Sequence, residues 1–381
     1  MNQPAVPELR LLADDLTGAL DTAAELTALC GPVQVLWDGA TAAAVPPGSV
    51  ALDCGTREAS RDMAVARVRT LAPMLAVAGA GIAYKKVDSL LRGHFAAELA
   101  ACFGLGAWPS CILAPAFPAQ GRITRGGRVL VRQPGGGYSP AGAGDLLAAL
   151  AAEGLPARTG SPDMASPPHG ITVCDAETED DLARLAALGR RAQGPVLWCG
   201  SGGLAHALAG TATVRPARML QAPVLGLFGS DQAATARQLA ACGPCWFRLA
   251  DGGSAEAARI ARRMDTDGVA LVSLDLPLGM GRDEAARRIE AAFTELTRHL
   301  PRPGTLLAAG GETLRALCRG LGARSLRTTG LVAPGVPRSV MQGGAWDGIA
   351  IVSKSGAFGG DPLWRDLLAG NGLPRTGSDE A

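Results

Sequence analysis

Short runs of apolar residues alternate with amphipathic stretches along most of the 381-residue chain. Apolar runs too short for a helix predict buried strands at 9–13, 33–37, 50–54, 82–87, 111–114, 171–174, 196–199, 224–228, 246–249, 269–274 and 305–309. Between them, apolar positions three to four residues apart predict helices at 17–29, 59–72, 95–103, 145–153, 179–193, 232–242 and 283–299. This order of strands and helices is typical of parallel sheets covered by helices, so we predict an α/β fold.

One segment interrupts the alternation within the first half of the chain. Residues 126–144 contain many glycines and prolines around a short apolar strand at 128–132. We interpret this segment as an excursion from the main fold, and the sequence leaves open whether it is a lid or a contact between two copies of the chain.

A second interruption, at residues 211–223, marks the domain boundary. This stretch has no clear period and carries Pro216 and Pro223. At roughly 100–200 residues per domain, a chain of this length is expected to form two domains. We expect each domain to be a largely parallel β-sheet flanked by helices, and we place the domains at 1–212 and 222–372, with a loose polar tail at 373–381.

The overall composition excludes several classes of protein. The chain has 36 basic and 35 acidic residues, so its net charge of +1 gives no electrostatic footprint for nucleic acid or an anionic membrane. No apolar run reaches the roughly 18 residues that a membrane span needs. The nine cysteines are scattered and the N-terminus lacks a secretion-signal pattern, which predicts reduced thiols in a cytoplasmic protein.

Lysine is nearly absent from the chain. Only Lys85, Lys86 and Lys354 are lysines, and the other 33 basic residues are arginines. Lysine is a compact point charge on a flexible stem, whereas arginine is a rigid planar fork. We therefore expect that an arginine could not replace the lysine at these three positions, which makes them candidate functional residues.

Two adjacent carboxylates follow the first predicted strand. Asp14 and Asp15 come directly after residues 9–13, and Thr17 opens the next helix. Ligands of open α/β sheets bind at the carboxyl ends of strands, and two neighbouring carboxylates can raise the pKa of one of them and leave a usable base. The alternative is an N-cap aspartate with a neighbour that favours the helix start.

A cationic cluster ends another predicted strand. Lys86, Asp88, Ser89 and Arg92 lie within seven residues at the end of the strand 82–87. Such a cluster suits an anionic substrate, and the alternative is an ion-paired surface turn that caps the next helix. Arg57 follows the predicted strand 50–54, so we expect this further cation at the same edge of the sheet.

Glycine-rich turns follow three strands of the second half of the chain. Glycines let backbone N–H groups approach an anion, and a helix N-terminus adds a favourable dipole. Together the turns predict a phosphate-binding site at Ser230, Gly310, Gly311, Glu312, Thr313, Lys354, Gly356 and Gly359. No turn matches the P-loop or the dinucleotide fingerprint, which argues against a dinucleotide-dependent oxidoreductase.

Other chemical motifs are rejected on their context. The pair Cys242 and Cys245 has thioredoxin-like spacing, but the predicted helix ends rather than begins there. The four histidines show no metal-ligand spacing, so we assign no metal ligand from the sequence.

The motifs together resemble those of the four-carbon acid sugar kinase family. Ala-Asp-Asp-Leu-Thr-Gly-Ala at 13–19, Lys-Val-Asp-Ser-Leu-Leu-Arg-Gly at 86–93 and Ala-Pro-Ala-Phe-Pro-Ala-Gln-Gly-Arg at 114–122 resemble the family's N-terminal domain. Gly-Ser at 229–230, Gly-Gly-Glu-Thr at 310–313, Ala-Pro-Gly-Val-Pro at 333–337 and Lys-Ser-Gly-Ala-Phe-Gly at 354–359 resemble its C-terminal domain. The resemblance extends over residues 9–368.

This resemblance implies an ATP-dependent kinase that phosphorylates D-threonate or D-erythronate at the 4-hydroxyl, with Mg²⁺ as cofactor. A 3-oxo-tetronate 4-kinase and, in another class, a non-catalytic acid-sugar-binding protein are the alternatives. The expected partners are the acid sugar and ATP, bound to the N-terminal and C-terminal domains on either side of an interdomain active-site cleft. The oligomeric state stays open between a monomer and a homodimer.

The resemblance also suggests roles for single residues. Lys86, Arg92 and Arg57 would meet the carboxylate of the acid sugar, and the aspartates would meet its hydroxyls. The candidate substrate-binding residues are Asp14, Asp15, Thr17, Arg57, Lys86, Asp88, Ser89 and Arg92. Either Asp15 or Asp88 would be the catalytic base, and Gly335 joins the nucleotide-binding set. Two departures from the family pattern have effects that the sequence leaves open: Leu90 for a usual threonine and Ala357 for a common asparagine.

Overall fold

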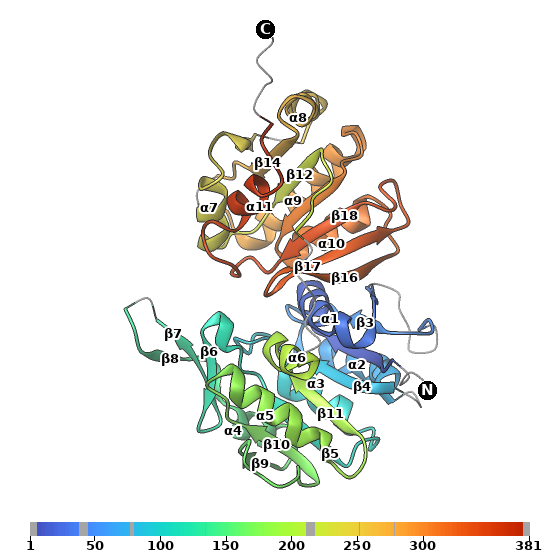
Figure 1. Ribbon diagram of the computed structural model, residues 1–381, viewed down its shortest axis with the longest axis vertical. Helices are drawn as coiled ribbons and strands as arrows, with labels where there is room; N and C mark the ends of the chain where they lie inside the picture. Colours follow the sequence, from blue (N-terminus) through green and yellow to red (C-terminus); the bar gives the residue numbers. More distant parts are fainter. Residues whose placement is uncertain are drawn as a thin grey trace. The chain divides into compact units, whose positions relative to one another are not determined.

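The computed structural model describes residues 6–37, 45–76, 80–133, 135–210, 218–250, 252–277 and 279–375 (Figure 1). The chain divides into two compact units, residues 1–214 and 215–381. Part of the predicted boundary (211–217) and part of the predicted tail (376–381) lie outside the described residues. We describe each unit by itself.

The first unit is built on a parallel sheet with the strand order β2-β3-β1-β4-β11-β5-β10-β9. Its strands are β1 (Glu8–Ala13), β2 (Val33–Leu36), β3 (Val50–Asp53), β4 (Ala80–Lys86), β5 (Ser110–Ala114), β9 (Ala157–Gly160), β10 (Gly170–Cys174) and β11 (Val196–Gly200). Because all neighbouring pairs are parallel, the carboxyl ends of the strands share one edge of the sheet. The predicted parallel sheet is therefore confirmed for this unit.

Helices cover both faces of this sheet. The helices are α1 (Leu16–Cys30), α2 (Arg61–Leu71), α3 (Phe95–Phe103), α4 (Leu146–Ala152), α5 (Glu179–Arg190) and α6 (Gly202–Ala209), with the 3₁₀ helix η2 at Ala72–Ala76. Helices α1, α6 and α5 pack together on one face, whereas α2, α3 and α4 pack together on the other. Apolar strand residues such as Leu12, Leu52 and Leu113 are fully buried in the core beneath α2 and α3. Their burial fits the short apolar runs of the sequence.

The predicted excursion forms a small sheet of its own. Strands β6 (Arg122–Arg125), β7 (Arg128–Arg132) and β8 (Tyr138–Asp145) are antiparallel, and the β7–β8 hairpin projects from the first unit (Figure 1). Gly142 of β8 packs on the loop after β4, since a Cβ atom on it would lie 2.6 Å from the carbonyl oxygen of Leu90. This small sheet therefore supports that loop, and its tip at residue 134 lies outside the described residues.

The second unit has a mixed sheet with the strand order β13-β14-β12-β15-β18-β17-β16. The strands are β12 (Val224–Phe228), β13 (Trp246–Leu249), β14 (Val269–Leu274), β15 (Thr305–Ala309), β16 (Ser325–Ala333), β17 (Val336–Gln342) and β18 (Ala350–Lys354). The first five strands in this order are parallel, but β17 runs antiparallel to both β18 and β16. The apolar-run pattern does not predict β16 or β17, because buried and partly exposed residues alternate along them.

Helices also cover both faces of the second sheet. They are α7 (Ala233–Ala240), α8 (Ser254–Asp267), α9 (Arg282–His299), α10 (Gly311–Gly320) and α11 (Leu363–Ala369). Helix α9 packs against both α8 and α10, and α7 packs against α11. Among the helices of the described ranges, none combines the length and the apolar character that a membrane span requires.

Candidate active site

The predicted N-terminal site residues gather at the carboxyl ends of three neighbouring strands. Asp14 and Asp15 follow β1, Lys86 ends β4, and Arg57 lies four residues after the end of β3. Since β1 lies between β3 and β4 in the sheet, strand order brings these side chains to one place.

Arg57 lies at the centre of this group. Its Nε and Nη2 donate to the two carboxylate oxygens of Asp14 at 2.8 and 2.9 Å, and its Nη1 donates to Asp15. Its Nη2 is also 3.5 Å from a carboxylate oxygen of Asp88. Burial alone would raise the pKa of Asp14, but the Arg57 guanidinium holds it below its ordinary value. Arg57 thus orders the carboxylates, whereas the sequence predicts a ligand of the substrate at this position.

Asp15 both caps a helix and belongs to the cluster. Its carboxylate accepts the backbone N–H of Gly18 at 2.7 Å, as an N-cap of α1, and the hydroxyl of Thr17 at 2.8 Å. The capping interpretation and the functional one therefore describe the same side chain. The adjacent Asp14 does not cap α1 and is bound by Arg57.

Asp88 organises the loop after β4. Its carboxylate accepts the backbone N–H groups of Leu90 and Arg92 at 3.2 Å, and the Arg92 side chain through two bonds of 2.8 Å. The loop turns at Leu91, a non-glycine residue with a φ of 57°. Burial would raise the pKa of Asp88, but the bonds from Arg92 and the charge of Arg57 hold it well below its usual range.

The two adjacent lysines have different environments. Lys85 is fully buried, and its Nζ lies 2.7 Å from Oε2 of Glu98 on α3. The other carboxylate oxygen of Glu98 accepts the hydroxyl of Thr56 at 2.6 Å. Lys85 is therefore part of a buried network that ties β4 to α3 and to the loop after β3, which is a structural role.

Lys86 and Ser89 offer open hydrogen-bond donors to the site. Lys86 is only 4% exposed, yet its ammonium makes no hydrogen bond or ion pair with any residue in the described ranges. The ammonium lies beside the start of α1, because a Cβ atom on Gly18 would lie 3.1 Å from it. Ser89 is also buried, and its hydroxyl has no hydrogen-bond partner in the described part of the chain. Buried donors of this kind suit a polar, anionic ligand.

Sequence reasoning missed one cation near this cluster. Arg122 begins β6 and is 7% exposed, and it interacts electrostatically with Asp88 and Arg92. The sequence feature that could have indicated Arg122 is the motif 114–122, which ends at this residue. The motif resembles the family's but assigns no role to its last residue.

In the second unit, the structure brings four predicted nucleotide-binding residues together. A Cβ atom on Gly356 would lie 2.1 Å from the hydroxyl oxygen of Ser230, and one on Gly310 would lie 3.6 Å from the Cβ of Ser230. Gly310 has a φ of 98°, and a Cβ atom on it would also lie 3.5 Å from the hydroxyl oxygen of Thr313. The turns after β12, β15 and β18 therefore meet at the carboxyl edge of the second sheet.

Lys354 and Gly359 shape the last of these turns. Lys354 is 1% exposed, and its Nζ donates to the hydroxyl of Thr235 at 3.2 Å and to the carbonyls of Ser355 and Gly356 at 3.1 and 3.0 Å. Three acceptors match the three N–H groups of an ammonium, and burial lowers the pKa of Lys354 to about 7. At Gly359 the chain adopts a φ of 84°, with its carbonyl bound by a side-chain amide.

The remaining nucleotide candidates are less closely joined to this cluster. Gly311 and the exposed Glu312 form the first turn of α10. Gly335 lies in the β16–β17 turn, and the antiparallel register of β17 with β18 places that turn alongside the end of β18. No group of three His, Cys, Asp or Glu residues able to hold a metal occurs in the described ranges. Mg²⁺ in kinases commonly uses one or two carboxylates together with substrate phosphates, so such a group is not required.

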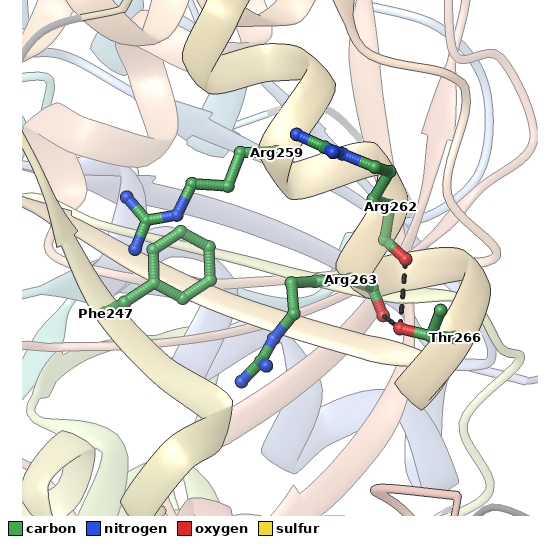
Figure 2. Close-up of a pocket in the computed structure, with 5 residues that line it drawn as sticks. All are labelled: Phe247, Arg259, Arg262, Arg263 and Thr266. Atoms are coloured by element: carbon green, nitrogen blue, oxygen red, sulfur yellow. Dashed lines mark hydrogen bonds between the residues drawn. The ribbon is translucent and has the colours of Figure 1, made fainter.

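Two hollows on the units do not involve the predicted site residues. One, of about 360 Å³, lies between β13 and α8, where Arg259 stacks on Phe247 with 4.5 Å between the guanidinium carbon and the ring centroid (Figure 2). Its Arg263 is paired with Asp267 at 3.1 Å. The other, of about 600 Å³, is lined by Trp108 and Trp198. None of the predicted substrate or nucleotide residues lines either hollow.

Each of the two units contains a stretch that matches a known domain family. Residues 9–152 match the model of a sugar-binding N-terminal domain, and residues 225–363 match that of a nucleotide-binding C-terminal domain. A D-threonate kinase of Cupriavidus necator is 35% identical over 93% of this chain and 96% of the relative. A D-threonate kinase of Bordetella bronchiseptica is 31% identical over 93% of this chain and 95% of the relative.

A solved structure has the same fold. It is a Salmonella typhimurium protein described as a tRNA synthase, with a TM-score of 0.74 and 21% identity, and the match covers 94% of this chain and 98% of that one. At this identity the likeness bears on the fold alone. The two domain matches and the two kinases aligned over nearly their whole length, together with the motifs at the strand ends, show that the chain belongs to the four-carbon acid sugar kinase family.

Proposed function

We propose that this protein is an ATP-dependent D-threonate kinase that phosphorylates its substrate at the 4-hydroxyl. The observation that carries the proposal is that two kinds of group lie together at one edge of the sheet. Lys86 and Ser89 are hydrogen-bond donors without a partner in the described ranges, and Asp14 and Asp15 are carboxylates held in place nearby. An aldonate carries one carboxylate and several hydroxyls, so it needs both cations and hydrogen-bond acceptors. The names of the two aligned relatives support D-threonate over other four-carbon acids.

The base of the proposed reaction is Asp15 rather than Asp88. Asp88 accepts four hydrogen bonds, two of them from the Arg92 side chain, whereas Asp15 accepts three, one of them from a guanidinium, so the ionised form of Asp88 is the more strongly stabilised and Asp88 is the weaker base. Asp15 lies next to the Lys86 ammonium at the start of α1, where positive charge offsets the charge that develops during transfer. Asp88 then has the role of a substrate-site organiser.

In the proposed transfer, the 4-hydroxyl oxygen bonds to the γ-phosphorus while the bond between that phosphorus and the β–γ bridging oxygen breaks. The hydroxyl proton passes to Asp15, and the products are ADP and 4-phospho-D-threonate. The turns that contain Ser230, Gly310 and Gly356 hold the nucleotide phosphates through backbone N–H groups. Mg²⁺ would enter with ATP and would neutralise phosphate charge, so we assign it no protein ligand.

The test measures ADP release from ATP and Mg²⁺ with D- and L-threonate, D- and L-erythronate and 3-oxo-tetronate as acceptors. We expect turnover with D-threonate, a loss of kcat in Asp15→Asn, and mainly a raised KM in Asp88→Asn. Asp163→Asn is the matched control, because Asp163 is exposed and pairs only with surface Arg184 in the described part of the chain. Preference for another acid would overturn the substrate, and ATP binding without turnover of any acid would favour a non-catalytic binding protein.

A further inference from the structure

We propose that Glu98 is a positioning residue for phosphoryl transfer, which fixes the places of Arg57 and Lys86 from the opposite face of the sheet. It acts through two intermediates, Thr56 and Lys85. This inference rests on the proposed function and adds a residue that acts only through its neighbours. Glu98 lies in the first turn of α3 and is 1% exposed, and α3 packs with α2 and α4 on the face of the sheet that α1 does not cover.

One carboxylate oxygen of Glu98 holds the loop that carries Arg57. Its Oε1 accepts the hydroxyl of Thr56 at 2.6 Å, and Thr56 is fully buried. The backbone N–H groups of Thr56 and Arg57 both donate to the carbonyl oxygen of Asp14, at 2.9 and 3.2 Å. Thr56 is therefore fixed to α3 by its side chain and to the end of β1 by its backbone. This sets the point from which the Arg57 side chain extends to Asp14 and Asp15.

The other carboxylate oxygen of Glu98 holds the strand end that carries Lys86. Its Oε2 lies 2.7 Å from Nζ of Lys85, and the same Nζ donates to the carbonyl oxygen of Lys86 at 3.0 Å. Burial would lower the pKa of Lys85, but the Glu98 carboxylate raises it above its ordinary value, so Lys85 stays charged. Because Lys85 is near the end of β4 and Glu98 is near the start of α3, the pair also joins the two ends of the loop 87–94, which contains Asp88.

Stability alone does not account for an ion pair at this place. Apolar side chains of similar volume can often replace a buried ion pair at no cost in stability, because desolvation of the two charges offsets their attraction. Apolar side chains make no directional bonds, however, and could not hold the Thr56 hydroxyl and the Lys86 carbonyl at fixed distances. Each oxygen of Glu98 contacts the residue that directly precedes a site cation. Since displacements of about 1 Å can cost about 100-fold in rate, this arrangement bears on activity.

The first test removes the Thr56 hydroxyl and leaves the ion pair in place. Thr56→Val has nearly the same shape, so Lys85 and Glu98 stay paired while the loop with Arg57 loses its bond to α3. We expect kcat/KM for D-threonate to fall about 10-fold, with the KM for ATP unchanged. Thr56→Ser keeps a hydroxyl and should recover most of the loss.

Ser49→Ala is the matched control for the loss of a buried hydroxyl. Ser49 precedes β3 at its amino end, whereas Thr56 follows its carboxyl end. The Ser49 hydroxyl accepts Leu9 N–H at 3.1 Å and donates to the Cys30 carbonyl at 3.0 Å. Thermal unfolding should show similar destabilisation in Ser49→Ala and Thr56→Val, but only Thr56→Val should lose activity. Full activity in Thr56→Val, or equal losses of activity in both variants, would overturn the proposal.

Combination with Arg57→Lys separates positioning from a general loss of stability. If Thr56 acts through Arg57, then Thr56→Val should cost little further activity once the guanidinium is absent, whereas independent effects would multiply. Glu98→Gln also weakens the hold on Lys85, so it should lower kcat/KM further even in the Arg57→Lys background. Multiplying losses for Thr56→Val, or no further loss for Glu98→Gln, would contradict the two routes. Should Glu98→Gln fail to fold, the Thr56 variants carry the test.

Solvent exchange of the Arg57 Nε–H proton, followed by NMR without substrate, tests the role separately from the kinase assignment. Its signal is identified by its absence in Arg57→Lys. The bond from Nε to Asp14 at 2.8 Å should protect this proton in wild type, and exchange should be about 10-fold faster in Thr56→Val. If this difference is present but wild type phosphorylates none of the acids, the proposed function fails and the positioning of Arg57 stands. Equal exchange in wild type and Thr56→Val would overturn the positioning role.

Discussion

Arg57 binds both carboxylate oxygens of Asp14, a residue 43 positions earlier in the chain, at 2.8 and 2.9 Å. This pair joins the loop after β3 to the end of β1, and the same guanidinium reaches Asp15 and Asp88. One buried cation therefore sets the positions of three carboxylates on which the proposed chemistry depends.

Replacing this guanidinium by an ammonium should damage activity more than folding. Arg57→Lys keeps the charge but loses the two-bond geometry, so the three carboxylates would no longer be held in one arrangement. We expect kcat/KM for the acid sugar to fall at least about 10-fold, with a destabilisation of about 1–3 kcal/mol. Kinetics and thermal unfolding measure the two effects. Arg61→Lys, at an exposed ion pair, is the control, and equal behaviour of the two variants would contradict the assignment.

A single methyl group at Gly18 should disturb both Asp15 and Lys86. The added Cβ would lie 2.6 Å from the Asp15 carboxylate and 3.1 Å from the Lys86 ammonium, so at least one of them must move. We expect Gly18→Ala to lower kcat about 10-fold or more, because positioning errors of this size cost that much. The control is Gly135→Ala, where no atom lies near the added Cβ. Unchanged kcat in Gly18→Ala would show that neither group contacts the substrate.

Asp21 should make the protein less stable at neutral pH than at acid pH. Asp21 is buried on α1, and burial raises its pKa from 3.8 to about 6. Between these values the folded state binds more protons than the unfolded state, so this group's contribution is complete below pH 3.8 and is lost as pH rises through 6. We expect Asp21→Asn to stabilise the first unit at pH 7.5, by up to about 3 kcal/mol, and to give little gain at pH 4.

Thermal unfolding of wild type and Asp21→Asn at the two pH values measures this difference. Asp62→Asn serves as the control because the Asp62 side chain is 95% exposed. A gain in Asp21→Asn that is the same at both pH values would argue against titration of Asp21 as its cause.

Lys354 should control nucleotide binding through the shape of its turn. Its three N–H groups are taken by Thr235, Ser355 and Gly356, so Lys354→Met would leave those buried oxygens without the donor. We expect the dissociation constant for ATP to rise about 10-fold and that for D-threonate to stay unchanged, since the proposed D-threonate site lies in the first unit.

The pH dependence of ATP binding provides a second measurement for Lys354. The pKa of this lysine is lowered to about 7, so above that pH its amine has one N–H fewer than the three acceptors require. Wild-type affinity for ATP should therefore weaken as pH rises from 6 to 8, and Lys354→Met should lack this change. Parallel pH profiles for the two proteins would contradict the role given to Lys354.

The sequence by itself determined the central strands and the edge on which the chemistry lies. The runs that became β1 and β4 are mainly apolar, apart from Arg10 and the lysines at the end of β4, because both faces of a parallel sheet are covered by helices. The polar residues that follow them, Asp14 and Lys86 among them, had to lie at one edge once the strands were parallel. Strands β16 and β17 escaped prediction, because their alternating burial leaves no such run.

Only the tertiary structure decided which side chains meet. Lys85 and Lys86 are neighbours in sequence with the same chemistry, but successive residues of a strand point to opposite faces of the sheet. Lys85 consequently pairs with Glu98 of α3 on one face, and Lys86 lies beside Gly18 of α1 on the other. Arg57 likewise joins the site through hydrogen bonds to Asp14 and Asp15, which precede it by more than 40 residues, so its place depends on strand order rather than on any local pattern.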